Sequence, residues 1–245
     1  MNNKTNGNSS TLKKALLIVH QKRSDPGEVG QKLKARGYQL DIRRPVLGEK
    51  LPDSMENHDL AVIFGGPMSI NDMNHQFIKK EIHWIELALK SNKPFLGICL
   101  GAQMLAKNLG GAVRKNNDNT YEIGFFDIIP TQYGSKMFKK QKTFFQWHNE
   151  GFNVPQDCFI LAEGKKFHQQ AFKYKNTYGL QFHPEVNIKL HFLWLYHTLL
   201  SAPHKLNNKG AQSIARQLTQ RIKYNHKIKL WLDDFLDNYL LKEED

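Results

Sequence analysis

The sequence has few cysteines and no long apolar run. Its 245 residues include only two cysteines, Cys99 and Cys158, and no C-x-x-C pair. Two cysteines cannot build a disulfide framework or a metal knuckle, so we expect a reducing, cytoplasmic setting, no metal and no cofactor. The longest apolar runs, such as LAVIF from Leu60, are far shorter than the roughly 20 residues that cross a bilayer, so we expect no membrane partner.

Acidic residues are also in deficit. Lys and Arg number 35 against 23 Asp and Glu, which gives a formal net charge of +12. Such a charge attracts polyanions, including nucleic acids. The basic residues are scattered, however, and their densest cluster, GSKMFKKQK from Gly134 to Lys142, falls in an expected loop. We therefore predict no nucleic-acid partner.

Short apolar runs alternate with amphipathic stretches, which predicts an α/β fold with a mostly parallel central sheet flanked by helices. Beyond Gly111 the runs become rich in Phe, Tyr and Ile, which indicates an antiparallel or mixed part of the sheet. The strands expected in the first half cover residues 15–19, 39–43, 59–64 and 94–98, and the helices cover 26–36 and 75–90.

Three segments are expected along the chain. The polar, Asn-rich residues 1–12 predict a disordered tail, residues 13–200 the main domain, and residues 201–245 a helical extension packed on that same domain. Apolar residues recur with helical spacing at Ile228, Trp231, Leu232, Phe235, Leu236, Tyr239 and Leu240. This amphipathic helix is expected to close over the core; a homodimer or partner-docking face is the alternative.

Cys99 lies in the element Gly97-Ile98-Cys99-Leu100-Gly101, after an expected strand and before an expected helix. This G-x-C-x-G pattern is the thiol version of the G-x-S-x-G nucleophile elbow. The glycines permit the sharp turn, and the N-terminus of the helix stabilises a thiolate. The Leu100 N–H is free to bind an oxyanion. The alternative is a buried structural cysteine, which is how we interpret Cys158.

A thiolate needs a base and a group that orients the base. The segment QFHPEV, Gln181 to Val186, places His183 and Glu185 on either side of a proline at the end of an expected strand. Residues two apart in an extended segment share a face, so the carboxylate can reach the imidazole. The sequence therefore predicts a Cys99-His183-Glu185 triad.

The segments LGICLGAQ and QFHPE resemble those of the class I glutamine amidotransferases. The resemblance covers roughly Leu16 to Leu200 and is closest to the stand-alone, GMP-synthase-like subgroup, through DIRRP, GGPMS and WHNEGF. It implies a flavodoxin-like fold and hydrolysis of the side-chain amide of glutamine through a γ-glutamyl thioester. Cys99 would be the nucleophile, His183 the acid and base, and Glu185 the orienting carboxylate.

The resemblance also implies the substrate contacts. Gly65, Gly66 and Leu100 would hold the oxyanion, and Gln103 would help to seat the glutamine. Glu122 and His148, the latter with Glu150, are candidates for contacting the amino-acid end of the substrate.

No G-x-x-x-x-G-K-[ST] motif is present, so no acceptor chemistry is expected in this chain. Ammonia would pass to a separate synthetase subunit. Two alternatives remain open: a γ-glutamyl peptidase or hydrolase that uses the same triad, as in plant relatives of the family, and a regulatory or scaffold protein with an inactive site.

Overall fold

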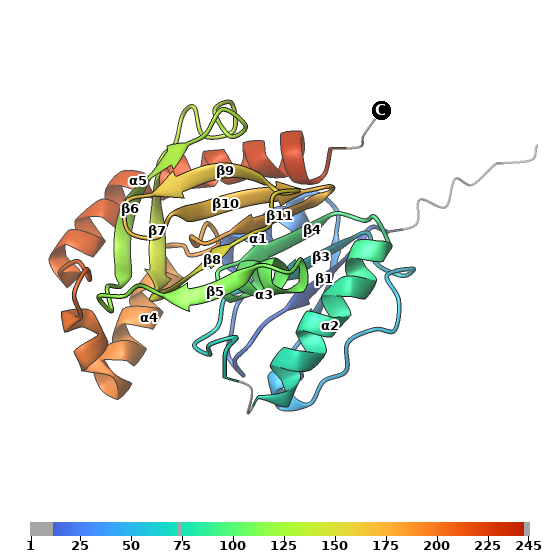
Figure 1. The fold of residues 1–245 in the computed structure, drawn as a ribbon, viewed down its shortest axis with the longest axis horizontal. Coiled ribbons are helices and arrows are strands. Elements are labelled where there is room, and N and C mark those ends of the chain that lie inside the picture. Colours follow the sequence, from blue (N-terminus) through green and yellow to red (C-terminus); the bar gives the residue numbers. More distant parts are fainter. Residues whose placement is uncertain (1–11, 73–74, 243–245) are drawn as a thin grey trace, which may run out of the picture.

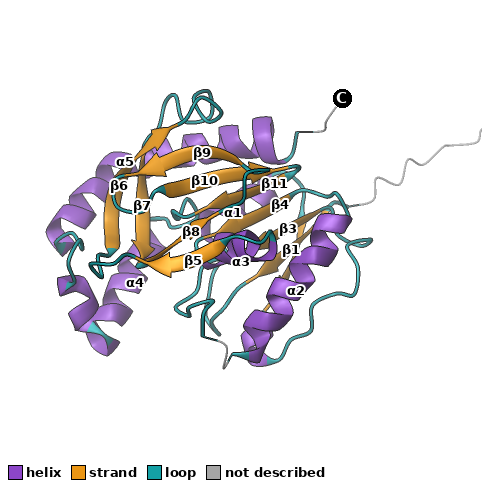
Figure 2. Ribbon diagram, in the orientation of Figure 1, coloured by secondary structure: helices purple, strands orange, loops and turns teal. Residues whose placement is uncertain are grey.

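The computed structural model describes residues 12–72 and 75–242 (Figure 1). The predicted tail, residues 1–12, lies outside the described residues except for Leu12. The rest forms one 11-stranded sheet with helices on both of its faces, as Figure 2 shows. The predicted α/β architecture is confirmed.

One half of the sheet is parallel. Its strands, in spatial order, are β2 (Gln39–Arg43), β1 (Lys14–Ile18), β3 (Leu60–Ile63), β4 (Phe95–Ile98) and β11 (Thr177–Leu180). Every residue of β3, β4 and β11 is buried. Helices cover both faces of these strands, which explains why they read as continuous apolar runs.

The other half is antiparallel and more aromatic. It continues from β11 through β10 (Gln169–Tyr174), β9 (Phe159–Gly164), β6 (Glu122–Pro130) and β7 (Thr143–His148). Two short strands that the sequence did not predict, β5 (Ala112–Lys115) and β8 (Glu150–Asn153), pair with each other, and β8 also pairs with β10. The sheet is therefore mixed, and β11 is the strand at which its direction changes.

Two hydrophobic clusters fill the space between the sheet and the helices. On one face lie α2 (Gln76–Lys90) and α3 (Leu100–Asn108), and on the other lie α1 (Gly27–Ala35) and α5 (Ile214–Phe235) (Figures 1 and 2). Helix α4 (Ile188–Ser201) follows β11 and packs against α5. Short helical turns complete the chain: η1 (Pro45–Leu47), η2 (Pro203–Asn207) and the π turn η3 (Leu236–Leu240).

Helix α5 is longer than the apolar repeat predicted. It begins at Ile214, where the Ser213 side chain accepts a hydrogen bond from the Arg216 N–H. The residues of the apolar repeat from Ile228 to Leu236 are all buried in the cluster that also contains residues of α1. Arg36, which directly follows α1, pairs with Asp233 of α5 at 3.0 Å and with Asp237 of η3 at 2.7 Å, so charge also joins the end of α1 to this region.

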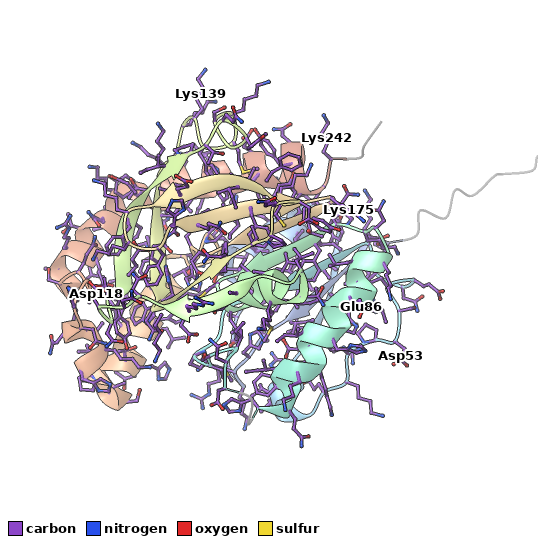
Figure 3. The ribbon with its side chains drawn as sticks, viewed as in Figure 1. Asp53, Glu86, Asp118, Lys139, Lys175 and Lys242 are labelled. Atoms are coloured by element: carbon purple, nitrogen blue, oxygen red, sulfur yellow. The ribbon has the colours of Figure 1, made fainter. Side chains whose placement is uncertain are left out.

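Many charged side chains lie at the periphery of the molecule. Lys139, Lys175 and Lys242 point outward from three separate places in Figure 3. Among the described residues no helix is both long enough and apolar enough to span a membrane.

Candidate active site

Cys99 occupies the turn between β4 and α3. Its backbone has φ 51° and ψ −104°, a left-handed conformation that is uncommon for a residue other than glycine. The Cys99 N–H donates to the Leu180 carbonyl at 2.7 Å, which ties the turn to β11. A side chain at Gly101 would collide with the Ile63 carbonyl of β3. The strained turn thus depends on glycine at this position.

His183 and Glu185 follow β11 and are both buried. The His183 Nδ1 lies 2.8 Å from the Glu185 Oε1, and the His183 N–H donates to the Phe145 carbonyl of β7 at 2.8 Å. The Trp194 ring of α4 meets the imidazole edge to face at 5.1 Å. Glu185 and Trp194 therefore fix the imidazole, and β7 fixes the backbone of His183.

The pKa of His183 reflects its two charged neighbours. Burial acts to lower this pKa, but the charges of Glu185 and Cys99 outweigh burial and raise it to about 10. The hydrogen bond to Glu185 acts in the same direction, whereas the His183 Nε2 has no hydrogen-bond partner among the described residues. Cys99 is therefore close enough to His183 to interact with the imidazole electrostatically.

The loop after β3 brings two glycines to the same place. A Cβ on Gly65 would lie 2.7 Å from the His183 Cε1 and 3.4 Å from the Cys99 Cβ. A Cβ on Gly66 would lie 2.9 Å from a side-chain carbon of Leu100. Leu100 is the first residue of α3, so its N–H has no acceptor within the helix. The structure thus gathers the three residues that were predicted to hold the oxyanion.

A buried ion pair that the sequence analysis missed supports this loop. The His20 Nδ1 lies 3.0 Å from the Gly65 carbonyl oxygen, and its Nε2 lies 2.9 Å from the Glu81 Oε2. Both side chains are fully buried. Burial acts to lower the pKa of His20, but Glu81 raises it overall, so His20 donates from both nitrogens. Because C=O and N–H of a trans peptide point in opposite directions, this bond turns the Gly66 N–H away from His20.

The predicted substrate-contacting residues divide into two groups. Gln103 and His148 line the cavity beside Cys99, and both are held by the Glu150 carbonyl, at 3.0 Å and 2.9 Å. Glu122 is not among the residues that line this cavity. It lies behind His148, with its Oε2 3.2 Å from the His148 Nε2, and it also accepts a hydrogen bond from Gln170.

The cavity extends well beyond the three predicted triad residues. Its volume is about 800 Å³, and Trp147, Trp194 and Tyr121 form part of its wall. Four basic side chains also line it: Lys22, Arg23, Lys115 and Lys205. The sequence analysis did not single out these basic residues, since they come from three separate places in the sequence. Among the described residues, no group of three or more His, Cys, Asp or Glu is arranged to bind a metal ion.

Cys158 lies elsewhere, buried just before β9. Burial and the adjacent Asp157 raise the pKa of its thiol to about 12. Cys158 therefore remains a neutral thiol at physiological pH.

Comparison with known proteins agrees with this geometry. The sequence model of the family described as Glutamine amidotransferase class-I matches residues 25–196. The chain is 27% identical over 235 residues to the glutamine amidotransferase-like protein YfeJ of Salmonella typhimurium, covering 92% of this chain and 96% of that one. It is 29% identical over 157 residues to one subunit of a glutamine-hydrolysing GMP synthase of Saccharolobus solfataricus, covering 63% and 80%.

Solved structures lead to the same family. A glutamine amidotransferase from Thermotoga maritima superposes with a TM-score of 0.84 at 29% identity, covering 95% of this chain and all of that one. One from Methylobacillus flagellatus, at 22% identity, has the same fold, with a TM-score of 0.85 and coverage of 96% and 98%. This chain belongs to the class I glutamine amidotransferases.

Proposed function

We propose that the protein hydrolyses the side-chain amide of glutamine with Cys99 as nucleophile, His183 as acid and base, and Glu185 as the group that orients His183. The observation that supports this most directly is the buried 2.8 Å contact between His183 and Glu185, beside a cysteine in a strained left-handed turn. Family membership supports amide hydrolysis in general. A regulatory protein with an inactive site would need neither the aligned pair nor the strain.

In this mechanism the Cys99 sulfur attacks the amide carbon of glutamine. The carbonyl oxygen becomes an oxyanion, which the N–H groups of Gly66 and Leu100 stabilise. His183 gives its proton to the leaving nitrogen, ammonia departs, and a γ-glutamyl thioester remains on Cys99. His183 then takes a proton from water, which attacks the thioester and releases glutamate and the Cys99 thiolate. Gln103 and His148 border the position of the amino-acid end, and Glu122 acts through His148.

The decisive experiment is intact-mass analysis after incubation with an electrophilic glutamine analogue. The wild type and Cys158→Ala are expected to gain one adduct, and Cys99→Ala none. Ammonia release from glutamine, measured in parallel, should disappear in Cys99→Ala. Equal ammonia release by Cys99→Ala and the wild type would refute the proposal.

A γ-glutamyl peptidase or hydrolase is the second candidate, and the cavity favours it. A volume of about 800 Å³ falls in the range of about 300–1,000 Å³ typical of drug-sized ligands, and exceeds what one amino acid fills. The four basic side chains in its lining suit a leaving group that carries a carboxylate. A panel that compares kcat/KM for glutamine and for γ-glutamyl dipeptides separates the two candidates; inactivity on every dipeptide removes the second.

A separate synthetase subunit is the proposed destination of the ammonia. Relatives named as a single subunit of GMP synthase support this, because such a name implies a second subunit. We expect slow turnover of glutamine by the isolated chain, measured as ammonia release; fast turnover without a partner would contradict the expectation.

A further inference from the structure

Arg221 of α5 is the largest fully buried side chain in the described part of the protein, with 1% exposure. A guanidinium is always costly to bury, and the cost is usually offset by a contacting carboxylate. Within the described residues, Arg221 has no carboxylate within ion-pair distance of 4.0 Å. Some other set of contacts must therefore explain why an arginine lies here.

Those contacts are directed at the segment that contains the proposed base. The Arg221 Nη1 donates to the carbonyl of Val186, the residue after Glu185, at 2.6 Å. The guanidinium lies 4.8 Å from the ring centroids of Phe125 and Phe145, a distance typical of cation–π contacts. The Phe145 carbonyl in turn accepts the hydrogen bond of the His183 N–H. Arg221 thus contacts Val186 at one end of the stretch from His183 to Val186. At the other end it contacts Phe145, which binds the His183 N–H.

His191 of α4 fixes the orientation of the guanidinium. The Arg221 Nε donates to the His191 Nδ1 at 3.2 Å, and the His191 Nε2 lies 3.2 Å from the Gln217 Oε1. Burial and the charge of Arg221 lower the pKa of His191 to about 4, so the ring is neutral. Its Nδ1 then accepts from Arg221 while its Nε2 donates to Gln217. The arrangement joins α4 and α5 behind the catalytic segment.

The nearest negative charges complete the arrangement. Burial lowers the pKa of Arg221 to about 9, and the charges of Glu185 and Glu28 oppose that shift. Arg221 therefore remains protonated at neutral pH. The Glu185 Oε2 and the Arg221 Nη2 are both buried without a hydrogen-bond partner in the described residues. The charge of Arg221 thus acts on the Glu185 carboxylate through space, with no hydrogen bond between the two side chains.

We propose that Arg221 is a positioning residue: from the C-terminal helix it holds the His183 to Val186 segment and the Glu185 carboxylate in the orientation that lets His183 act on Cys99. The proposal rests on the proposed function for the identity of the base. It assigns the region after residue 200 a part in catalysis beyond closing the core. An arginine that only filled space would not need polar contacts to Val186 and His191.

The test measures the reactivity of Cys99, which does not require glutamine to be the substrate. In a Cys158→Ala background, Arg221→Met and Arg221→Lys are compared with Arg216→Met and Arg216→Lys, which change an exposed arginine on the same helix. The rate of alkylation by iodoacetamide is recorded from pH 5 to pH 9, and kcat and KM are measured for glutamine. Ile228→Ala, which shortens a buried side chain of α5 away from the segment, controls for lost stability.

We expect Arg221→Met to slow alkylation at pH 7 about tenfold and to lower kcat about 10- to 100-fold, as loss of a supporting residue commonly does, with KM within about twofold. Loss of the positive charge should move the acidic limb of the alkylation profile to higher pH, because the protonated forms of the triad are then favoured. Ile228→Ala should lower the melting temperature without moving this limb. Arg221→Lys should recover part of the rate.

Alkylation of Arg221→Met at the rate and with the pH profile of Arg216→Met would overturn the proposal. If Arg221→Met does not fold, Arg221→Lys decides in the same way, because its ammonium cannot contact both Val186 and His191 as the guanidinium does. If the wild type releases no ammonia from glutamine but its alkylation still depends on Arg221, the proposed substrate is wrong and the positioning role stands.

Discussion

The two sides of the candidate site are built differently. On the nucleophile side, backbone geometry places Cys99, and Gly65 and Gly101 leave no room for a side chain. On the base side, side chains hold His183, among them Glu185 of the same segment and Trp194 of α4. The nucleophile side therefore depends on local conformation, whereas the base side depends on tertiary packing. Substitutions that affect one side and leave the other intact test this difference.

The largest effect is expected on the base side from Glu185→Gln. The amide can donate a hydrogen bond to Nδ1 and so favour the wrong tautomer of His183. By analogy with the orienting carboxylate of serine proteases, kcat should fall about 10⁴-fold with KM little changed. Ammonia release from glutamine measures it, with Glu56→Gln, at an exposed site, as the control. A loss of less than tenfold would show that the carboxylate does not orient the base.

On the nucleophile side, Gly65→Ala should have the next largest effect. The new Cβ would lie 2.7 Å from the His183 Cε1, so the loop must move away from the position that binds the oxyanion. We expect kcat/KM to fall about 10²- to 10³-fold, as loss of one oxyanion donor does. Gly48→Ala is the control: the φ of Gly48 is positive, but its Cβ would meet open space. It should lower stability without this loss of activity.

The packing on the base side should also make the protein less stable in acid, because His191 binds a proton when the chain unfolds. Its pKa is about 4 in the folded protein, below the ordinary value of 6.5. Between these values the unfolded chain binds the proton and the folded chain does not, so the free energy of unfolding decreases as the pH falls through this window. The decrease is on the order of 3 kcal/mol at most and is absent above pH 6.5.

His191→Gln keeps an acceptor for Arg221 and removes the titrating group. Urea unfolding at pH 7 and pH 4.5 gives, for this variant and for the wild type, the free energy of unfolding that each loses between the two pH values. We expect the variant to lose less stability than the wild type. Parallel losses would show that His191 does not bind a proton on unfolding in this range.

The smallest effect should come from Glu81→Gln, beneath the oxyanion loop. The variant keeps a hydrogen-bonding group near the His20 Nε2 but removes the charge that keeps His20 protonated. Nδ1 then donates to the Gly65 carbonyl less strongly, and kcat should fall about tenfold, equivalent to about 1.4 kcal/mol. Glu86→Gln, on the same helix at an exposed site labelled in Figure 3, should change nothing. Equal kcat values for the two variants would show that the ion pair between His20 and Glu81 does not position the loop that contains Gly65.

The difference between local conformation and tertiary packing also explains which parts of the site the sequence could predict. The turn at Cys99 was predictable because its glycines lie within two residues of the cysteine. Arg221 and His20 were not, because their partners are distant in the chain: Val186 is 35 residues from Arg221, and Glu81 is 61 residues from His20. An arginine in an amphipathic helix is ordinarily exposed, so its spacing gave no signal.

In the fold, too, the elements with local sequence patterns were predicted and those that depend on distant pairing were not. The parallel strands and their helices were predicted within a few residues, because buried apolar runs and helical spacing are local patterns. Strands β5 and β8 were missed, since AVRK and EGFN have neither alternation nor an apolar run. They form only where the two segments meet and pair. The division of the chain into a main domain and an extension stays a prediction.

The ion pair between Arg36 and Asp237 joins residues 201 positions apart. A ribosome makes the chain from the N-terminus, so β1 to β4 and the segment around Cys99 are synthesised long before α5 emerges. During synthesis the cysteine can therefore be in place while the base still lacks the packing that α5 provides. With the proposed function, the site would become reactive only after α5 has been made, which limits the time during which a partly folded chain carries a reactive thiol.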